Sequence, residues 1–336
     1  MSWGHSFLAV ACGLAFTALR AGASADQPAP AAAKASLVIV VGAEGEESYR
    51  TLFKTAGSAF ALAGQSAQAS VHSFGVEENE NADVHEALRS LLAAEPTSGS
   101  EPLWLVLIGH GTVDGKEGKF NLRGTDLSAS ELAAMLKLIE RPVVIVAAFS
   151  ASGAFLAPLS APGRAIVTAT RSGSETNYAH FAEQIAQTIA DPAADLDHDG
   201  QTSLLEAWLS AARRVAAFYE SDGRLATEHS LLDDNGDGLG TPADWFSGTR
   251  VVKKANDARA PDGRRAHQLH LVRSSTDRAL APELRAQRDA VELEIAALRD
   301  KKESLPEDEY YAELEALCVR LANIYRGKSD APPPAR

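Results

Sequence analysis

The sequence predicts an α/β protein with a mostly parallel sheet and helices on its faces. Residues 103–109 and 143–149 are short, almost wholly apolar runs, typical of strands that are buried on both faces of a parallel sheet. A helical pattern at 130–139 lies between them and has the length that a β–α–β crossover needs. The carboxyl ends of such strands share one edge of the sheet, and open α/β sheets bind ligands at that edge.

Residues 1–25 are predicted to be a secretory signal peptide. Their apolar core, 7–19, is too short to span a bilayer, and Ala23-Ser-Ala25 is a small-x-small cleavage site. We therefore expect an exported protein, periplasmic or secreted, with no stable membrane span after cleavage. An uncleaved anchor is the alternative. Residues 26–35, rich in alanine and proline, are predicted to be a flexible lead-in.

The composition narrows the class of partner. Apolar residues make up 45% of the 336-residue chain and charged residues 23%, as is ordinary for a soluble globular protein. The net charge of −13 argues against nucleic acid, whose phosphates need a basic face, and suits cation binding. After signal cleavage one cysteine, Cys318, would remain, so no internal disulfide is expected.

Residues 36–190 are predicted to form the α/β domain. Besides the two apolar runs, it should contain further strands and helices. The expected strands are 37–41, 70–74 and 164–170, and the expected helices are 48–62, a segment beginning near 84, and 178–189. The glycines after the first strand lack the spacing of a phosphate-binding loop, so a nucleotide is not expected.

Polar residues follow each apolar run and carry the candidate chemistry. His110-Gly111 ends the first run, and Ser150-Ala-Ser-Gly153 ends the second. This pairing resembles the caspase/legumain-type cysteine peptidases, in which one strand ends in His-Gly and another in Cys-x-Ser-Gly. The resemblance covers about residues 36–190 and implies a caspase-like sheet.

The resemblance also implies roles. His110 would be the general base, and Ser150 stands where the family has its nucleophilic cysteine. The backbone N–H groups of Gly111 and Ser150 would stabilise an oxyanion. Arg171 and Glu175 follow the next strand, where such peptidases shape the substrate pocket, and are candidate substrate-binding residues. Asp114 is either an orienter of His110 or a turn carboxylate.

The serine changes the chemistry. A cysteine beside a histidine readily becomes a nucleophilic thiolate, whereas a serine hydroxyl needs a well-oriented base. Neither Cys12 nor Cys318 is placed to substitute, because the first lies in the signal peptide and the second is expected on the apolar stripe of a helix. Ser150 is therefore a weak nucleophile or a small strand-end residue without a catalytic role.

A calcium-binding loop of the EF-hand type is predicted at 195–206. The ligand slots are filled in order, and Gly200 permits the sharp turn after the third acid. The expected ligands are Asp195, Asp197, Asp199, Gln201 through its carbonyl, Ser203, and Glu206 in the bidentate last slot. A helical segment is expected before the loop and a helix over 203–219 after it.

A second, incomplete loop is predicted 38 residues later, at a spacing that suits a face-to-face pair of hands. The expected ligands are Asp233, Asn235, Asp237, Leu239 through its carbonyl, and Asp244 in the last slot. Pro242 is poor for an exit helix, so a plain Asp/Asn/Gly turn is the alternative. Residues 191–250 together form the predicted calcium-binding region.

The C-terminal part is predicted to be helical. Residues 251–276 are a basic connector with a strand expected at 268–272; in such a strand His267 and His270 would face opposite ways and make no metal pair. Residues 277–326 are predicted to form a helical hairpin that could mediate oligomerisation, and 327–336 a disordered tail. The expected stripe of the second helix is Leu314, Leu317, Cys318, Leu321 and Ile324.

The sequence favours an exported, calcium-binding peptidase homologue that is catalytically impaired and binds a peptide or protein. An active hydrolase that uses Ser150 and His110 is the first alternative. A calcium-dependent structural or adhesive protein is the second. A carboxylate held on His110 would favour the hydrolase, and a cleft filled by side chains would favour the structural protein.

Overall fold

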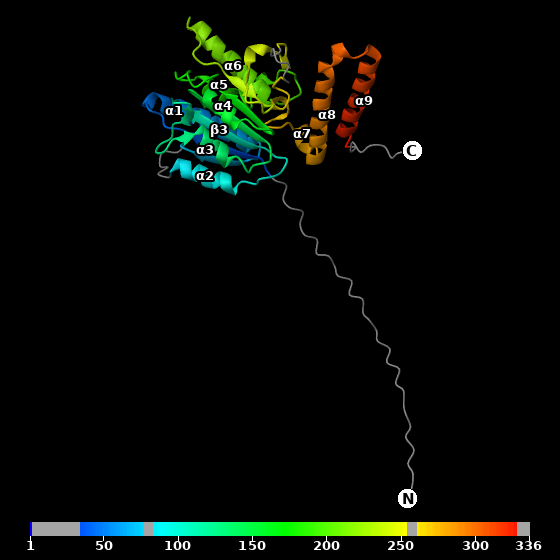
Figure 1. The fold of residues 1–336 in the computed structure, drawn as a ribbon, viewed down its shortest axis with the longest axis horizontal. Coiled ribbons are helices and arrows are strands. Elements are labelled where there is room, and N and C mark those ends of the chain that lie inside the picture. Colours follow the sequence, from blue (N-terminus) through cyan, green and yellow to red (C-terminus); the bar gives the residue numbers. More distant parts are fainter. Residues whose placement is uncertain (2–33, 77–82, 254–260, 328–336) are drawn as a thin grey trace. The chain divides into compact units, whose positions relative to one another are not determined.

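A seven-stranded sheet forms the centre of the computed structural model, which describes residues 1, 34–76, 83–253 and 261–327 (Figure 1). The strand order is β10-β9-β8-β7-β3-β1-β2, in which neighbours from β8 to β2 are parallel and β9 and β10 join antiparallel. The predicted α/β fold with a mostly parallel sheet is confirmed. The strands are β1 (Ser36–Val41), β2 (Ser70–Phe74), β3 (Leu103–Gly109), β7 (Val143–Phe149), β8 (Arg164–Thr168), β9 (Leu231–Asp233) and β10 (Thr241–Pro242).

Helices cover both faces of the sheet because both faces of its inner strands are apolar. In β1, Leu37 and Ile39 belong to the apolar core that also contains residues of α1, α5 and α6, whereas Val38 and Val40 belong to the core on the other face, with residues of α2, α3 and α4. Every residue of β1, β3 and β7 is buried, as continuous apolar runs require. The helices are α1 (Glu47–Ser66), α2 (Val84–Ala94), α3 (Ala129–Met135), α4 (Gly153–Leu159), α5 (Phe181–Thr188) and α6 (Leu204–Ser221).

Caps set several helix boundaries. Helices α3 and α6 each begin with a capping box, formed by Ser128 with Glu131 and by Ser203 with Glu206. Helix α5 begins three residues later than the sequence predicts. The carboxylate of Glu228 accepts the N–H groups of His180 at 2.8 Å and Phe181 at 3.0 Å, so a distant residue fixes this helix end.

A three-stranded antiparallel sheet lies beyond the end of β3. It consists of β4 (Gly111–Asp114), β5 (Glu117–Phe120) and β6 (Leu127–Ser128). Asp114 is exposed there and pairs with Lys119 at 3.1 Å, so it is a turn carboxylate. A separate two-stranded ribbon follows β10, with β11 (Phe246–Ser247) and β12 (Arg250–Val251).

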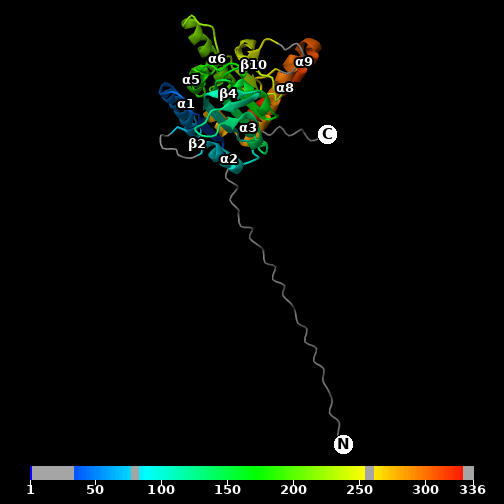
Figure 2. The same ribbon diagram turned by 60° about the vertical axis from the view of Figure 1, so that its left-hand side comes forward.

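The C-terminal part contains α7 (Ser275–Ala279), α8 (Pro282–Asp300) and α9 (Glu307–Tyr325) (Figures 1 and 2). Helices α8 and α9 pack through Val291, Ile295 and Ile324. Cys318 is exposed, so its expected place on the apolar stripe is wrong. The spacing of Tyr310, Leu314, Leu317, Leu321 and Ile324 turns Cys318 away from α8.

The strand expected at 268–272 is also wrong. A 3-10 turn, η3 (Ala266–Gln268), precedes irregular chain; Ala266 is buried in the turn and Leu271 in the irregular chain. The described residues from 34 to 327 belong to one compact unit. The predicted signal peptide, most of the lead-in and the tail after 327 lie outside the described residues. Within the described ranges, none of the helices is long and apolar enough to cross a membrane.

Candidate functional site

His110 and Ser150 emerge from neighbouring parallel strands. Strands β3 and β7 are in register to their ends, where Gly109 pairs with Phe149. The next residue on each strand is therefore His110 on one side and Ser150 on the other. The sheet thus brings both predicted catalytic residues to the same edge, as parallel topology requires.

The hydroxyl of Ser150 is bound to the backbone of Gly111. Its Oγ accepts the Gly111 N–H at 3.0 Å and donates to the Gly111 carbonyl at 3.2 Å. Ser150 is buried, with 2% of its surface exposed. A Cβ on Gly111 would lie 2.4 Å from the Ser150 carbonyl oxygen and 2.6 Å from the Phe149 ring, so only glycine permits this approach.

The backbone bends sharply after Ser150. Ala151 has φ of +60°, a left-handed conformation that costs a non-glycine residue about 1 kcal/mol, and it is buried. Its N–H donates to the carbonyl of Glu175 at 2.7 Å. The next hydroxyl, Ser152 Oγ, accepts the N–H groups of Ala169 at 3.0 Å and Thr170 at 3.1 Å. This turn is held by the loop that follows β8.

The ring of His110 lies among aromatic side chains. Its centroid is 4.9 Å from Tyr49, 5.1 Å from Phe53 and 6.1 Å from Tyr178, edge to face in each case. Burial lowers the pKa of His110, while a hydrogen bond with the Glu44 backbone and the charge of Glu46 act in the opposite direction.

The His110 ring thus packs among aromatic side chains, whereas the Ser150 hydroxyl is bound to the Gly111 backbone. In the part of the chain that the structure describes, no hydrogen bond joins the His110 ring to Ser150 Oγ. The N–H of Gly111, predicted to stabilise an oxyanion, already donates to Ser150. In this arrangement neither the base–nucleophile contact nor a free oxyanion donor at Gly111 is preformed.

Arg171 and Glu175 meet, together with His229, which no spacing rule places there. Glu175 Oε1 lies 3.0 Å from Arg171 Nε and 2.6 Å from His229 Nδ1. Its Oε2 accepts the backbone N–H groups of Arg171 at 3.0 Å and His229 at 3.2 Å. Glu175 is mostly buried, while 60% of the Arg171 side chain is exposed. The guanidinium is therefore both positioned and accessible.

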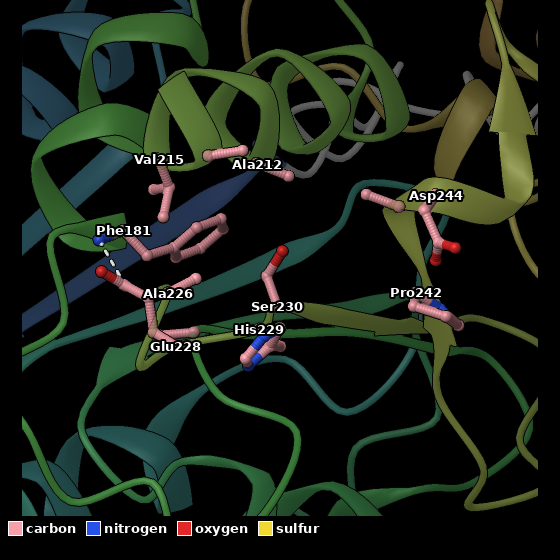
Figure 3. A pocket seen from close by; sticks show the side chains of 12 residues that line it. Phe181, Ala212, Val215, Ala226, Glu228, His229, Ser230, Pro242 and Asp244 are labelled. Carbon is pink, nitrogen blue, oxygen red and sulfur yellow. Dashed lines mark hydrogen bonds between the residues drawn. The ribbon is translucent and has the colours of Figure 1, made fainter. Parts of the chain in front are cut away.

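A cavity of about 230 Å³ adjoins His229 (Figure 3). Phe181 and Val215 line one side of it, and His229 and Ser230 line the other. Most of the remaining lining is alanine and proline. Glu228 lies at its edge, and burial raises the pKa of this carboxyl to about 7, although the N–H groups of His180 and Phe181 and the Tyr219 hydroxyl lower it. The cavity suits a small apolar group.

The first predicted calcium loop has its carboxylates gathered. One oxygen each from Asp195, Asp197 and Asp199 lies within 4.8 Å of the others. The Oδ1 atom of Asp195 is buried and has no hydrogen-bond partner among the residues that the structure describes. Glu206 is buried at the start of α6, where Oε1 accepts the Asp197 N–H at 3.2 Å and Oε2 accepts the Ser203 hydroxyl at 2.8 Å. Gly200 adopts φ of +90°.

The helical segment expected before this loop is present, in two pieces. Helix α5 ends at Thr188, and only the short 3-10 turn η1 (Pro192–Ala194) directly precedes Asp195. Pro192 at the first position of this turn and the side chain of Asp191, which accepts the Ala193 N–H at 2.9 Å, fix the entry. The expected exit helix is present as α6.

The two loops share one pattern of internal hydrogen bonds. Asp195 accepts the N–H of Gly200 at 3.0 Å, and the equivalent Asp233 accepts that of Gly238 at 3.1 Å. In both loops the side chain of the third residue accepts the backbone N–H of the fifth residue. The side chain of the fifth residue accepts the backbone N–H of the seventh in the same way. These contacts are Asp197–Asp199, Asp199–Gln201, Asn235–Asp237 and Asp237–Leu239, at 2.8–3.1 Å. The first seven slots therefore fold alike.

The second loop departs from the pattern at its end. Asp244 pairs with Lys253 at 2.5 Å on the exposed surface, in the 3-10 turn η2 (Ala243–Trp245). No exit helix follows, since Pro242 lies in β10. Strand β10 pairs with β9, and among the described strands none pairs one loop with the other, so the expected face-to-face arrangement is not formed.

Comparison with known proteins gives distant structural neighbours. No family model matches the chain, and no curated protein matches it. Among solved structures, the Drosophila initiator caspase Dronc aligns with TM-score 0.40 and 15% identity over 61% of this chain and 81% of its own. Caspase-1 from Spodoptera frugiperda aligns with TM-score 0.40 and 11% identity, over 60% of this chain and 86% of its own. At this identity the matches do not identify a function.

Proposed function

We propose that the protein is an exported, calcium-binding homologue of the caspase/legumain-type peptidases that binds a peptide or protein without cleaving it. The observation that carries this proposal is the pair of hydrogen bonds between Ser150 Oγ and the Gly111 backbone. The hydroxyl at the nucleophile position serves the structure of the turn.

Acyl transfer by Ser150 would require several changes at once. The buried hydroxyl would have to leave both Gly111 partners, and its proton would have to reach a base. His110 is held among three aromatic rings, and its lowered pKa makes it a weaker base. The Gly111 N–H would have to be released for the oxyanion. Each change costs free energy before any chemistry begins.

A binding role is supported by the residues beside this turn. The exposed guanidinium of Arg171 is held by Glu175, which also contacts the Ala151 N–H through its carbonyl. A positioned arginine suits a carboxylate of a peptide ligand. The apolar cavity next to His229 suits a neighbouring small side chain. Together these features form a polar anchor and an apolar pocket at the ligand edge of the sheet.

Calcium binding is supported by the chemistry of the loops. Hard oxygen ligands are what calcium prefers, and the carboxylates of Asp195, Asp197 and Asp199 repel one another without a cation. The buried Asp195 Oδ1 lacks the partner that buried polar atoms ordinarily have. The first loop fits a cation better than the second, because Asp244, the expected last ligand of the second loop, forms an ion pair with Lys253. When bound, calcium would fix the segment between α5 and α6.

The experiment is cleavage of a diverse peptide library by the purified protein with calcium, beside Ser150→Ala and His110→Ala. We expect no cleavage by any of the three. Cleavage by the wild type that both variants lose would establish the alternative, a serine-dependent hydrolase, and overturn the proposal.

Binding is tested on an array of the same peptides. We expect a subset to bind the wild type and Ser150→Ala equally, and to bind Arg171→Ala at least tenfold more weakly. Arg213→Ala, at an exposed position on α6, is the matched control and should bind like the wild type. An array without any bound peptide would leave the calcium-dependent structural protein as the better description.

A further inference from the structure

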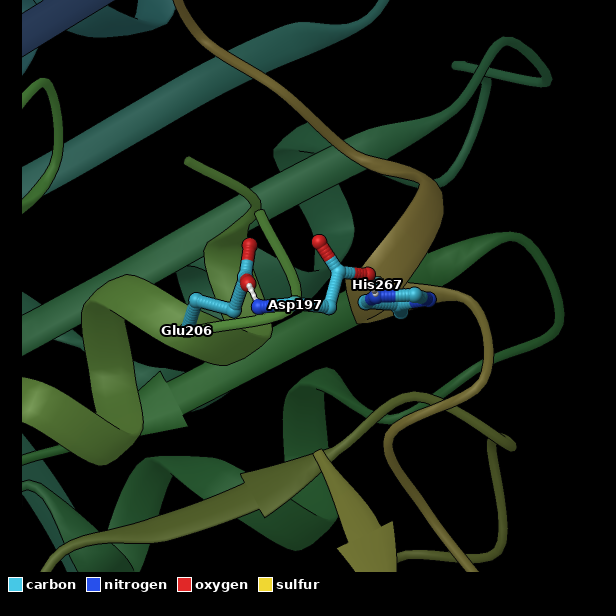
Figure 4. A group of neighbouring side chains, drawn as sticks. All are labelled: Asp197, Glu206 and His267. Carbon is cyan, nitrogen blue, oxygen red and sulfur yellow. Dashed lines mark hydrogen bonds and ion pairs between the residues drawn. The ribbon is translucent and has the colours of Figure 1, made fainter. Parts of the chain in front are cut away.

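A histidine from outside the first calcium loop contacts one of its ligands. His267 Nε2 lies 2.9 Å from Asp197 Oδ2, across 70 residues of sequence (Figure 4). One ligand atom each from Asp197, Glu206 and His267 lies within 4.8 Å of the others. An ionised carboxylate only accepts hydrogen bonds, so the His267 ring nitrogen is the donor. It holds the carboxylate of Asp197, the second expected ligand of the first loop, in place.

The chain around His267 is bound to the same loop at two further points. The backbone N–H of Leu204, directly after the loop's slot 9, donates to the Leu269 carbonyl at 2.7 Å. The side-chain carbonyl of Gln201 accepts the N–H of Ser274 at 3.0 Å. The first loop therefore contacts the segment 262–274 near its middle, at Leu269, and at its end, at Ser274.

The second loop binds the beginning of the same segment. Asp262 Oδ1 accepts the N–H groups of Asp234 at 3.0 Å and Asn235 at 3.2 Å. In return, the N–H of Ala266 donates to Asp234 Oδ2 at 2.8 Å. We call residues 262–274 the strap, because both loops hold it along its length.

The strap leads directly into the C-terminal helices. Ser274 is the N-cap of α7, and its Oγ accepts the Asp277 N–H at 3.2 Å. The side-chain amide of Gln268 donates to the carbonyl of Asp289 in α8 at 2.8 Å. The strap therefore caps the first turn of α7 and contacts α8 within its first turns.

We propose that His267 is a positioning residue of the first cation site, and that a cation in this site holds the strap, and with it α7 and α8, on the α/β domain. This inference rests on the proposed calcium binding. A contact that orients a ligand typically changes metal affinity 10–100-fold when it is removed. By reciprocity, a cation that favours the ordered strap must bind more weakly when the strap is loosened.

The test uses the purified protein and calcium chloride, by calorimetric titration, with three variants. His267→Ala should weaken calcium binding at the first loop about 10–100-fold. His267→Asn keeps an N–H donor and should recover part of the affinity. The matched control is His198→Asn, because His198 lies exposed in a non-ligand slot of the same loop and asparagine tolerates its φ of +62°. The control should bind calcium like the wild type.

Hydrogen exchange gives the second readout. In the wild type, calcium should slow amide exchange at least tenfold over 262–274 and in the first turns of α8, relative to chelator. His267→Ala should lose this difference at calcium concentrations that saturate the wild type, while its exchange in β3 and β7 is unchanged, which shows that the core remains folded.

Three results overturn the proposal, and each identifies a different failure. If the wild type and His267→Ala bind calcium equally, the histidine has no positioning role although the loop binds calcium. If calcium binds but leaves amide exchange in the strap unchanged, the cation does not hold the strap. If the wild type itself shows no heat of calcium binding, the proposed calcium binding fails first and the strap inference fails with it.

Discussion

Ser150 and Gly111, which follow neighbouring strands of the sheet, share two hydrogen bonds: the serine hydroxyl accepts the glycine N–H at 3.0 Å and donates to its carbonyl at 3.2 Å. The position that would hold a nucleophile thus ties the end of β7 to the beginning of β4. A side chain in this place contributes to stability through the backbone groups that it pairs.

Replacement of Ser150 by alanine should therefore destabilise the fold. The change leaves the Gly111 N–H without its partner in a buried site, which costs about 1–3 kcal/mol of the free energy of unfolding. Urea denaturation measures it. Ser174→Ala, at an exposed serine nearby, should change this free energy by less than about 0.5 kcal/mol. Equal free energies of unfolding for Ser150→Ala and the wild type would show that the two hydrogen bonds make no net contribution to stability.

Glu175 should matter more for stability than Arg171, although the two form one ion pair. Glu175 is mostly buried and also pairs with His229 and two backbone N–H groups, so Glu175→Gln should cost about 1–3 kcal/mol. Arg171 is largely exposed, and Arg171→Ala should cost less than about 1 kcal/mol. The same denaturation series compares them. A larger effect for Arg171→Ala would contradict this ranking.

Asp195 and Asp244 should differ in their effect on calcium. Asp195→Asn removes a charge from the gathered carboxylates of the first loop and should abolish its calcium-dependent rise in Tm. Asp244→Asn should leave calcium binding unchanged, because Asp244 pairs with Lys253. Melting curves with calcium and with chelator measure both. A loss of calcium response in Asp244→Asn would restore this residue as a ligand.

Glu228 should make stability depend on pH. Burial raises its pKa from the ordinary 4.5 to about 7, so the folded state holds this proton more tightly than the unfolded state. The resulting stability is fully present below about pH 4.5 and is lost as the pH rises through 7, by at most about 3 kcal/mol. Unfolding at fixed calcium between pH 5 and 7.5 measures the slope. Glu228→Gln should reduce this slope, and Asp262, whose pKa burial also raises to about 7, should account for part of the remainder. Equal slopes in the variant and the wild type would contradict the assignment.

Cys318 should react readily in the folded protein. Its side chain is exposed on the outer face of α9, so a thiol reagent such as DTNB should label it within minutes without denaturant. Cys318→Ser should remove this fast reaction and separates it from any contribution of Cys12. A reaction that appears only in urea would place Cys318 in the helix–helix contact after all.

Much of the fold follows from the sequence because it depends on local patterns. The apolar runs at 103–109 and 143–149 are typical of buried strands, and the crossover between them makes those strands parallel. The same local logic applies to the loop at 195–206, whose carboxylates are spaced to face one point. These features need no knowledge of distant contacts.

The tertiary structure alone decided what those residues touch. His229 reaches Glu175 and His267 reaches Asp197 across 54 and 70 positions, and no spacing rule connects them. The partner of Ser150 depends on how closely Gly111 approaches it, a distance set by the register of β3 and β7. Sequence periodicity reports which face a residue occupies, whereas hydrogen-bond partners depend on packing between elements that are far apart in the chain.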